Sequence, residues 1–142
     1  MDAIDKSGGH SRLFTLAEAN ALLPRVREQL GAIQSRAAQV SALHERLEAF
    51  REQKRRSGHA VEGESRLVLE ALQEADRIGA ELRSSIQELL DLGCELKDVQ
   101  MGLVDFPARR EDRTVYLCWR LGEDEIRYWH ELDTGFSGRQ PL

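Results

Sequence analysis

The residues best suited to chemistry lie in the last third of the chain. Arg139 stands in a segment that contains Gly135 and Gly138, and glycines let backbone amides approach a ligand closely. A guanidinium near a histidine is suited to bind an anion or another small ligand. The candidate ligand-binding residues are His130, Arg139, Trp119, Tyr128 and Asp105. The alternative is that Arg139 only forms an ion pair that joins the C-terminal tail to the rest of the fold.

A metal site is a second possibility, because imidazole, carboxylate and thiolate groups are the usual protein ligands. Such groups occur at Asp105, Cys118, His130, Glu131 and Asp133. Neighbouring residues in a strand point to opposite faces, and the strand pairing expected below places Cys118 on the face of Glu131, away from His130. We therefore predict no metal and no other cofactor, with a pair of His130 and Asp133 as the remaining alternative.

Nucleophilic catalysis has less support than ligand binding. Cys118 lies between large apolar residues in a predicted strand, and Cys94 follows a predicted helix C-terminus, where the helix dipole disfavours a thiolate. The sequence has no GxGxxG, Walker-type or HExxH motif. Whether the protein is an enzyme is left open.

These candidate residues depend on a hairpin predicted for residues 112–132, where side-chain type alternates along the chain. A two-residue turn at Gly122 and Glu123 would place Val115 opposite His130 on an apolar face. The other face is aromatic and charged, which favours a protein interface. Its candidate interface residues are Tyr116, Arg120, Arg127, Trp129 and Glu131. The alternative is that the arginines of this face only pair with glutamates across the strands.

Two long helices are predicted ahead of the hairpin, within residues 13–93. Apolar residues recur at steps of three and four over residues 16–40 and again over residues 68–89, a pattern typical of helices that face a partner helix. Ser57 and Gly58 mark a turn between them. We expect an antiparallel helical hairpin of coiled-coil-like character.

Local signals fix the ends of these helices. Thr15 and Glu18 have the spacing of a capping box at the first N-terminus, and Gly93 is suited to end the second helix. Pro24 predicts either a kink or a break into two helices.

The remaining segments complete an α+β fold. Residues 94–142 are predicted to form a small antiparallel sheet of two or three strands with a C-terminal tail, and residues 102–107 supply a brief strand that ends at Pro107. Residues 1–12 are polar and without period, so we expect a disordered N-terminus. Residues 13–142 are predicted to be a single domain.

Composition excludes several classes of protein. The net charge is −5, which argues against a general nucleic-acid binder. No apolar run approaches the roughly 20 residues of a membrane span, and the N-terminus lacks the apolar segment of a secretion signal. The two cysteines are not in a CxxC arrangement and fit a reducing compartment. We therefore expect a cytoplasmic protein.

Several short motifs carry a resemblance to a known family. They are FTLAEANALLP near the N-terminus, and GLVDFP, YLCWRLGE, YWHELDTGF and GRQPL in the last third. Over residues 13–142 the chain resembles a small bacterial family that is described as a domain of unknown function, number 2203. The resemblance implies a bacterial cytoplasmic protein with a long helical pair and a small sheet. It implies no catalytic residues, cofactor or partner.

Two functions remain from the sequence. The first is a non-enzymatic cytoplasmic module that assembles as a homodimer, because two helices alone leave apolar positions such as Leu22, Leu72 and Leu90 uncovered. The second is a ligand-binding or catalytic site where the sheet meets the tail, around His130 and Arg139.

Overall fold

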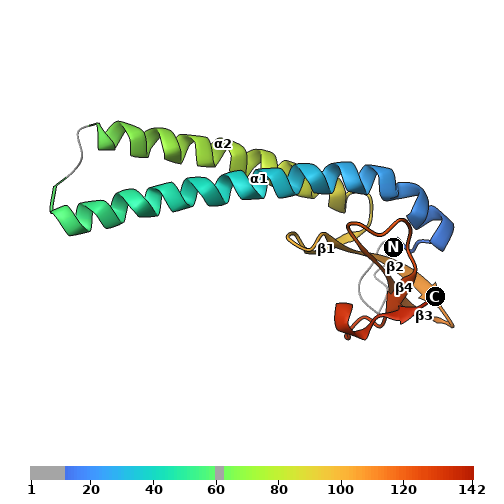
Figure 1. Ribbon diagram of the computed structural model, residues 1–142. Helices are drawn as coiled ribbons and strands as arrows, with labels where there is room; N and C mark the ends of the chain where they lie inside the picture. The colour runs from blue at the N-terminus through green and yellow to red at the C-terminus, as the bar shows by residue number, and fades with distance from the viewer. Residues whose placement is uncertain (1–11, 60–62) are drawn as a thin grey trace. The chain divides into compact units, whose positions relative to one another are not determined.

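The computed structural model describes residues 12–59 and 63–142 (Figure 1). Two helices that pack against each other are followed by a five-stranded antiparallel sheet, which confirms the predicted α+β class. The chain forms two compact units. The hairpin unit is Ala32–Ser85, and the sheet unit is the chain up to Gly31 together with the chain from Ile86 onward. Residues 1–11, most of the predicted disordered N-terminus, lie outside the described residues.

Helix α1 spans Leu16–Ser57 and helix α2 spans Glu64–Leu90. The predicted capping box is confirmed, since the Glu18 amide donates to Thr15 Oγ1 at 3.1 Å and the Thr15 amide donates to Glu18 Oε1 at 2.8 Å. These bonds favour the carboxylate and lower the pKa of Glu18. Helix α1 continues through Pro24, so the predicted alternative of two separate helices is wrong.

The hairpin unit has a narrow apolar core between α1 and α2. Leu43, Ala71 and Ile78 are buried there, and Ala71 and Ile78 belong to the apolar steps predicted over residues 68–89. At one end of this core, Arg36 donates to Ser85 Oγ at 2.9 Å and pairs with Glu81 at 3.4 Å. Within the described residues, neither helix combines the length and the apolar character that crossing a membrane requires.

The sheet has more strands than the two or three expected. Its strands pair antiparallel in chain order. They are β1 (Glu95–Asp98), β2 (Leu103–Arg110), β3 (Arg113–Arg120), β4 (Tyr128–His130) and β5 (Gln140–Pro141).

Strand β2 continues through Pro107, although we predicted that the strand would end there. The Pro107 carbonyl accepts a hydrogen bond from the Phe14 amide at 2.7 Å, so this residue faces away from β3, at a point where β1 has already ended. No ladder bond is lost at such a position, which is why proline is tolerated there. The tight turn of the sheet follows at Glu111 and Asp112, whose φ angles of 48° and 66° are those of a two-residue hairpin turn.

The predicted pairing of the next hairpin is wrong by one residue. Tyr116 lies opposite His130, and Cys118 lies opposite Tyr128, whereas we had expected Val115 opposite His130. The connection is residues 121–127, an odd number, and not the tight turn at Gly122 and Glu123. A shift of one residue moves every side chain of a strand to the other face. His130 therefore shares a face with Cys118.

The two faces of the sheet have different surroundings. The helix face carries Val104, Phe106, Ala108, Val115, Leu117, Trp119 and Trp129. It packs against the start of the sheet unit, where the rings of Phe14 and Phe106 meet edge to face at 5.3 Å between centroids. The opposite face, which we call the tail face, carries Asp105, Pro107, Thr114, Tyr116, Cys118, Tyr128 and His130.

Candidate metal centre

Three side chains with metal-ligand chemistry meet on the tail face. Asp105 comes from β2, Cys118 from β3 and His130 from β4, and Asp105 and Cys118 are direct cross-strand partners. One potential ligand atom of each residue lies within 4.8 Å of those of the other two. The three residues are 1%, 0% and 1% exposed, so the cluster is completely withdrawn from water.

The hydrogen bonds of His130 determine where its proton lies. Nδ1 is 2.7 Å from the Glu131 carbonyl oxygen, and Nε2 is 3.0 Å from Asp105 Oδ2. A carbonyl oxygen can only accept, so Nδ1 must carry a hydrogen. Nε2 and the Asp105 carboxyl then share one further proton, either as an ion pair or as a neutral acid and imidazole.

Asp105 is the least satisfied group of the cluster. Burial raises the pKa of its carboxyl above the ordinary value, while the charge and hydrogen bond of His130 act in the opposite direction. Its second oxygen, Oδ1, is buried and has no partner with hydrogen-bond geometry among the described residues, although the nearby Cys118 thiol also lowers the pKa of the carboxyl. An unpaired buried carboxylate oxygen costs free energy, so a ligand at this position would remove a penalty.

Cys118 is held as a thiol in the metal-free protein. Burial and, to a smaller extent, the Asp105 charge raise the pKa of its thiol to about 12, although the Arg139 guanidinium acts in the opposite direction. A thiol with such a pKa is a poor nucleophile at neutral pH. A bound metal ion would reverse this preference, because metal coordination deprotonates a thiol outright.

The same three residue types could form a nucleophilic triad, but the geometry opposes it. In a triad one histidine nitrogen faces the nucleophile and the other faces the orienting acid. Here both nitrogens of His130 are used, one by Asp105 and the other by the Glu131 carbonyl. No nitrogen remains to activate the Cys118 thiol, so the predicted lack of support for a cysteine nucleophile still stands.

The arrangement suits a metal ion better. A histidine that ligates through Nε2 typically donates its Nδ1 hydrogen to a carbonyl or carboxylate, which fixes the ring, and His130 already makes this bond to Glu131. Ligand atoms around tetrahedral zinc sit at about 2.0–2.3 Å from the ion. Three atoms within 4.8 Å of one another would reach that geometry with small side-chain movements, and an ion bound to His130 Nε2 would displace the proton that His130 and Asp105 share.

The cluster is bordered by further polar contacts on the tail face. The Tyr116 hydroxyl donates to the Glu95 carboxylate at 2.9 Å, and its ring lies beside His130 with 5.4 Å between centroids. Lys97 pairs with Glu95 at 2.8 Å and covers the Tyr116 ring. These contacts close the side of the cluster nearest β1.

Arg139 closes the side nearest the tail. Its Nη2 donates to the Cys118 carbonyl oxygen at 3.2 Å and to Glu123 Oε1 at 2.7 Å. Its guanidinium lies 4.2 Å above the Tyr128 ring and 4.7 Å from the Phe136 ring. This ion pair joins the tail to the connection between β3 and β4, as the alternative interpretation of Arg139 predicted, whereas a ligand-binding role for Arg139 stays a prediction.

The predicted ligand-binding set is only partly brought together. Asp105, His130 and Tyr128 share the tail face and Arg139 adjoins it, but Trp119 lies on the opposite face. The metal alternative of His130 with Asp133 is not the arrangement observed, because Asp133 is exposed and His130 uses Asp105.

The predicted interface residues do not form one surface. Tyr116 and Trp129 are buried on opposite faces of the sheet, whereas Arg120 and Arg127 are exposed. Glu131 is held by both ends of the Arg113 guanidinium at 3.0 and 2.7 Å. The face assignment failed because it depended on the wrong register.

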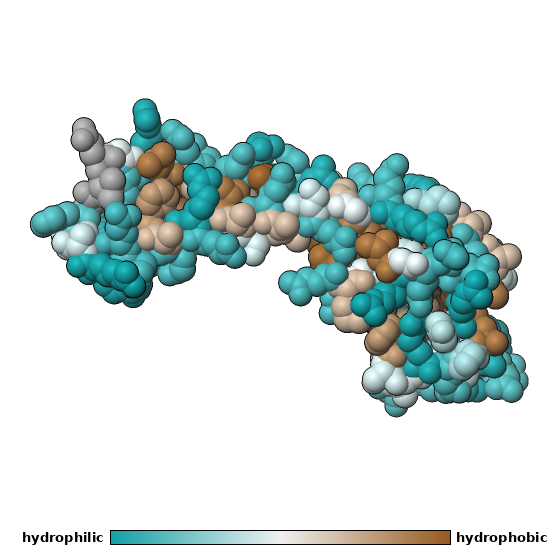
Figure 2. All heavy atoms as spheres, in the orientation of Figure 1, coloured by the Kyte–Doolittle hydropathy of each residue, from teal (hydrophilic) through white to brown (hydrophobic). Residues whose placement is uncertain are grey.

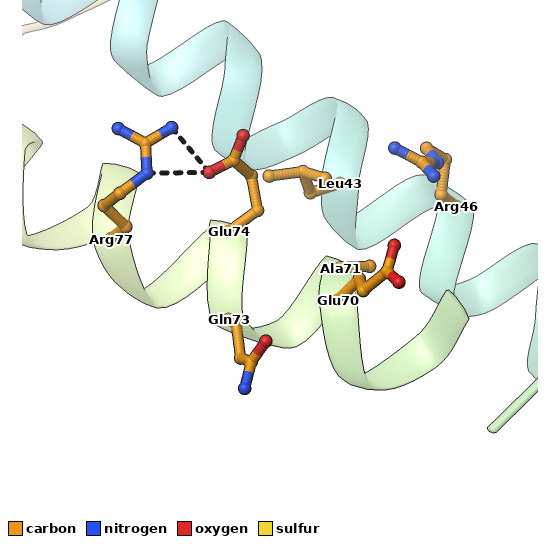
Figure 3. Close-up of a pocket in the computed structure, with 7 residues that line it drawn as sticks. All are labelled: Leu43, Arg46, Glu70, Ala71, Gln73, Glu74 and Arg77. Atoms are coloured by element: carbon orange, nitrogen blue, oxygen red, sulfur yellow. Dashed lines mark hydrogen bonds and ion pairs between the residues drawn. The ribbon is translucent and has the colours of Figure 1, made fainter. Parts of the chain in front are cut away.

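A separate open hollow lies in the hairpin unit (Figure 3). It has a volume of about 410 Å³ and an apolar floor of Leu43 and Ala71. Charged side chains surround it, and Arg77 donates to Glu74 at 2.8 Å. The arginine and glutamate side chains around the hollow carry balanced charges, and some of them pair with one another. The hollow therefore has no excess of one charge that would bind an ionic ligand.

Comparison with known proteins places the chain in a family. The model of an uncharacterised conserved protein family, DUF2203, matches residues 12–142, so the chain belongs to this family, as the sequence motifs indicated. No curated protein and no solved structure matches the chain.

Proposed function

We propose that this protein binds a divalent transition-metal ion, with zinc as the first choice, through Asp105, Cys118 and His130. The observation that carries the proposal is the meeting of carboxylate, thiol and imidazole from three strands within 4.8 Å, completely buried. The unpartnered Asp105 Oδ1 supports it.

Ligand chemistry favours zinc over hard cations. Calcium and magnesium take oxygen ligands, whereas thiolate together with imidazole suits zinc and similar metals. A Cys118 thiolate and an Asp105 carboxylate would balance the two positive charges of the ion, so the buried cluster would carry no net charge. Three protein ligands leave a fourth position for water or another small ligand.

The proposed ion would join three strands of a small sheet. Strand β4 is only three residues long, and His130 at its end would be linked by the metal to β2 and β3. A ligand that binds only the folded state raises the free energy of unfolding by RT ln(1 + [L]/Kd). This is about 2.7 kcal/mol at a free ligand concentration 100 times Kd. The ion would therefore strengthen the sheet unit.

Metal content of untagged protein tests the proposal. Elemental analysis after purification in zinc-containing buffer and gel filtration should give close to one zinc per chain, and Cys118→Ala should lose it. Cys94→Ala is the matched control, because Cys94 is also a buried free thiol but lies outside the cluster. A wild-type protein without zinc, or equal loss in the two cysteine variants, would reject the proposal.

We also propose a second function, assembly of two copies through the hairpin unit. Leu69 and Leu72 of α2 are 54% and 47% exposed, and apolar spheres lie among hydrophilic ones on this unit (Figure 2). The nearby hollow offers Arg46 and Arg77 beside Glu70 and Glu74, a mixture that a second copy could match by symmetry. This module would act without catalysis, and two buried free thiols fit the reducing cytoplasm.

Light scattering coupled to gel filtration tests the assembly proposal. We expect the mass of a dimer at micromolar concentration and the mass of a monomer after Leu69→Glu with Leu72→Glu. Leu121→Glu is the control, since Leu121 is 37% exposed and belongs to the sheet unit. A well-folded wild-type monomer would rule out the dimer and leave the metal proposal untouched.

A further inference from the structure

We propose that the C-terminal tail, residues 131–142, is a lid over the metal site and that Arg139 is its latch. This inference rests on the proposed metal function and adds its regulation: opening of the tail sets the rate at which an ion enters and leaves. The starting observation is that the three ligands are at most 1% exposed, so an ion cannot reach them while the surrounding chain stays in place.

The tail returns to the edge of the sheet beside β4, and its Arg139 side chain reaches the tail face. It begins directly after His130, passes through a short 3-10 turn at Phe136–Gly138, and pairs with β4 through Gln140 and Pro141. On this path the Arg139 guanidinium reaches the Cys118 carbonyl and lies over the Tyr128 ring. Cys118 and Tyr128 are themselves cross-strand partners, so Arg139 covers the sheet beside a proposed metal ligand.

The tail is fastened to the rest of the sheet unit near its two ends. Arg113 pairs with Glu131 at 2.7 Å at the start, and the Leu142 amide donates to the Arg127 carbonyl at 3.0 Å at the end. The Thr134 amide donates to the Glu131 carbonyl and the Arg139 amide donates to the Phe136 carbonyl, so these bonds stay within the tail. Strand β5 contributes only two residues. A segment with few bonds to its surroundings opens at a lower free energy than the core.

The latch is the ion pair of Arg139 with Glu123. The Arg139 Nη2 atom lies 2.7 and 2.9 Å from the two Glu123 oxygens, and the two side chains are 14% and 24% exposed. Glu123 is fixed to the sheet, because its Oε1 accepts from the Arg120 amide at 2.7 Å and its carbonyl accepts from Trp119 Nε1 at 3.0 Å. The pair therefore links the connection between β3 and β4 to the C-terminal part of the tail.

The latch also contains one unsatisfied hydrogen-bond donor, which favours opening of the lid. Arg139 Nε is buried and has no hydrogen-bond partner among the described residues. Closing the lid thus costs the desolvation of one donor, and opening it returns that donor to water. The unpaired donor offsets part of the stabilisation from the ion pair, and this lowers the free energy of opening the tail.

Zinc release into excess chromogenic chelator measures the lid directly. Arg139→Gln and Glu123→Gln should each release zinc about tenfold faster than wild type, the factor that corresponds to roughly 1.4 kcal/mol of lost closure. Both variants should still load close to one zinc, because neither changes a ligand. Arg127→Gln is the control, since its side chain is 60% exposed and pairs with Glu125 at 3.7 Å. Equal release rates in all four proteins would overturn the lid.

Alkylation of metal-free protein provides a readout that needs no metal. Cys118 should react with iodoacetamide about tenfold faster in Arg139→Gln than in wild type, as quantified by peptide mass spectrometry. Loss of Arg139 also removes the charge that lowers the Cys118 pKa, which by itself would slow the reaction, so acceleration reports exposure. Cys94 in the same molecule is the internal control, and equal acceleration at both cysteines would mean general unfolding and would overturn the lid.

The two readouts separate the two proposals. If wild type binds no zinc but Cys118 is selectively exposed in Arg139→Gln, the metal function fails and the lid over Cys118 remains. If zinc binds and neither release nor alkylation changes, the metal function remains and the lid fails.

Discussion

Replacement of Asp105 with alanine should destabilise the metal-free protein by about 1–3 kcal/mol, the usual cost of leaving a buried polar group without its hydrogen-bond partner. The change leaves His130 Nε2 without its 3.0 Å partner in a site that is 1% exposed. Urea unfolding followed by circular dichroism measures the difference. A loss below about 1 kcal/mol, the range of an exposed pair, would contradict the geometry described for this pair.

Asparagine at the same position separates stability from function. The amide of Asp105→Asn can donate to His130 Nε2 and places no charge in the core, so the metal-free variant should be at least as stable as wild type. Because burial raises the pKa of Asp105, its contribution to stability is present below the unfolded value of about 3.9 and is lost as the pH rises through the folded value. The advantage of Asp105→Asn should therefore grow with pH, while its zinc affinity falls.

Replacement of Trp119 with alanine should cost about 3–5 kcal/mol, as expected for truncation of a fully buried aromatic side chain. Trp119 is 0% exposed, donates from Nε1 to the Glu123 carbonyl at 3.0 Å, and lies 5.6 Å from the Arg27 guanidinium. Chemical unfolding should show the full loss in this variant and less than about 0.5 kcal/mol in Arg127→Ala, an exposed position. Similar losses in both variants would show that Trp119 is not part of the core.

Local patterns predicted the helices well because the forces that form helices are local. The capping box at Thr15 and Glu18 needs only residues three apart, and the apolar steps predicted the buried positions Leu23, Leu30 and Leu89. Pro24 was harder, since a long helix can absorb one missing hydrogen bond when its neighbours pack well. Family membership was also correctly indicated by the short motifs.

The cluster of Asp105, Cys118 and His130 escaped prediction because strand register is not a local property. The sequence favoured a tight turn at Gly122, but the connection is longer and is held by helix α1. Asn20 accepts the Ile126 amide at 2.8 Å, and Arg27 donates to the Asp124 carbonyl at 2.8 Å. These contacts join residues about 100 positions apart in the chain, as the separations of 106 and 97 show.

The assumed length of that connection decided which residues were predicted to share a face of the sheet. If the connection between the strands has an even number of residues, His130 and Cys118 lie on opposite faces of the sheet, and the hypothesis of a metal site is rejected. With the observed odd loop, Asp105, Cys118 and His130 fall on one face. The residue types were visible in the sequence from the start, and considering both loop parities would have revealed the cluster.

X-ray absorption at the zinc edge of the purified, zinc-loaded protein tests the central claim most directly. The proposed site predicts one sulfur at about 2.3 Å and nitrogen or oxygen atoms at about 2.0–2.2 Å, with the sulfur lost in Cys118→Ala and kept in Cys94→Ala. A first shell made only of nitrogen and oxygen atoms in the wild-type protein would show that Cys118 is not a ligand and would contradict the site.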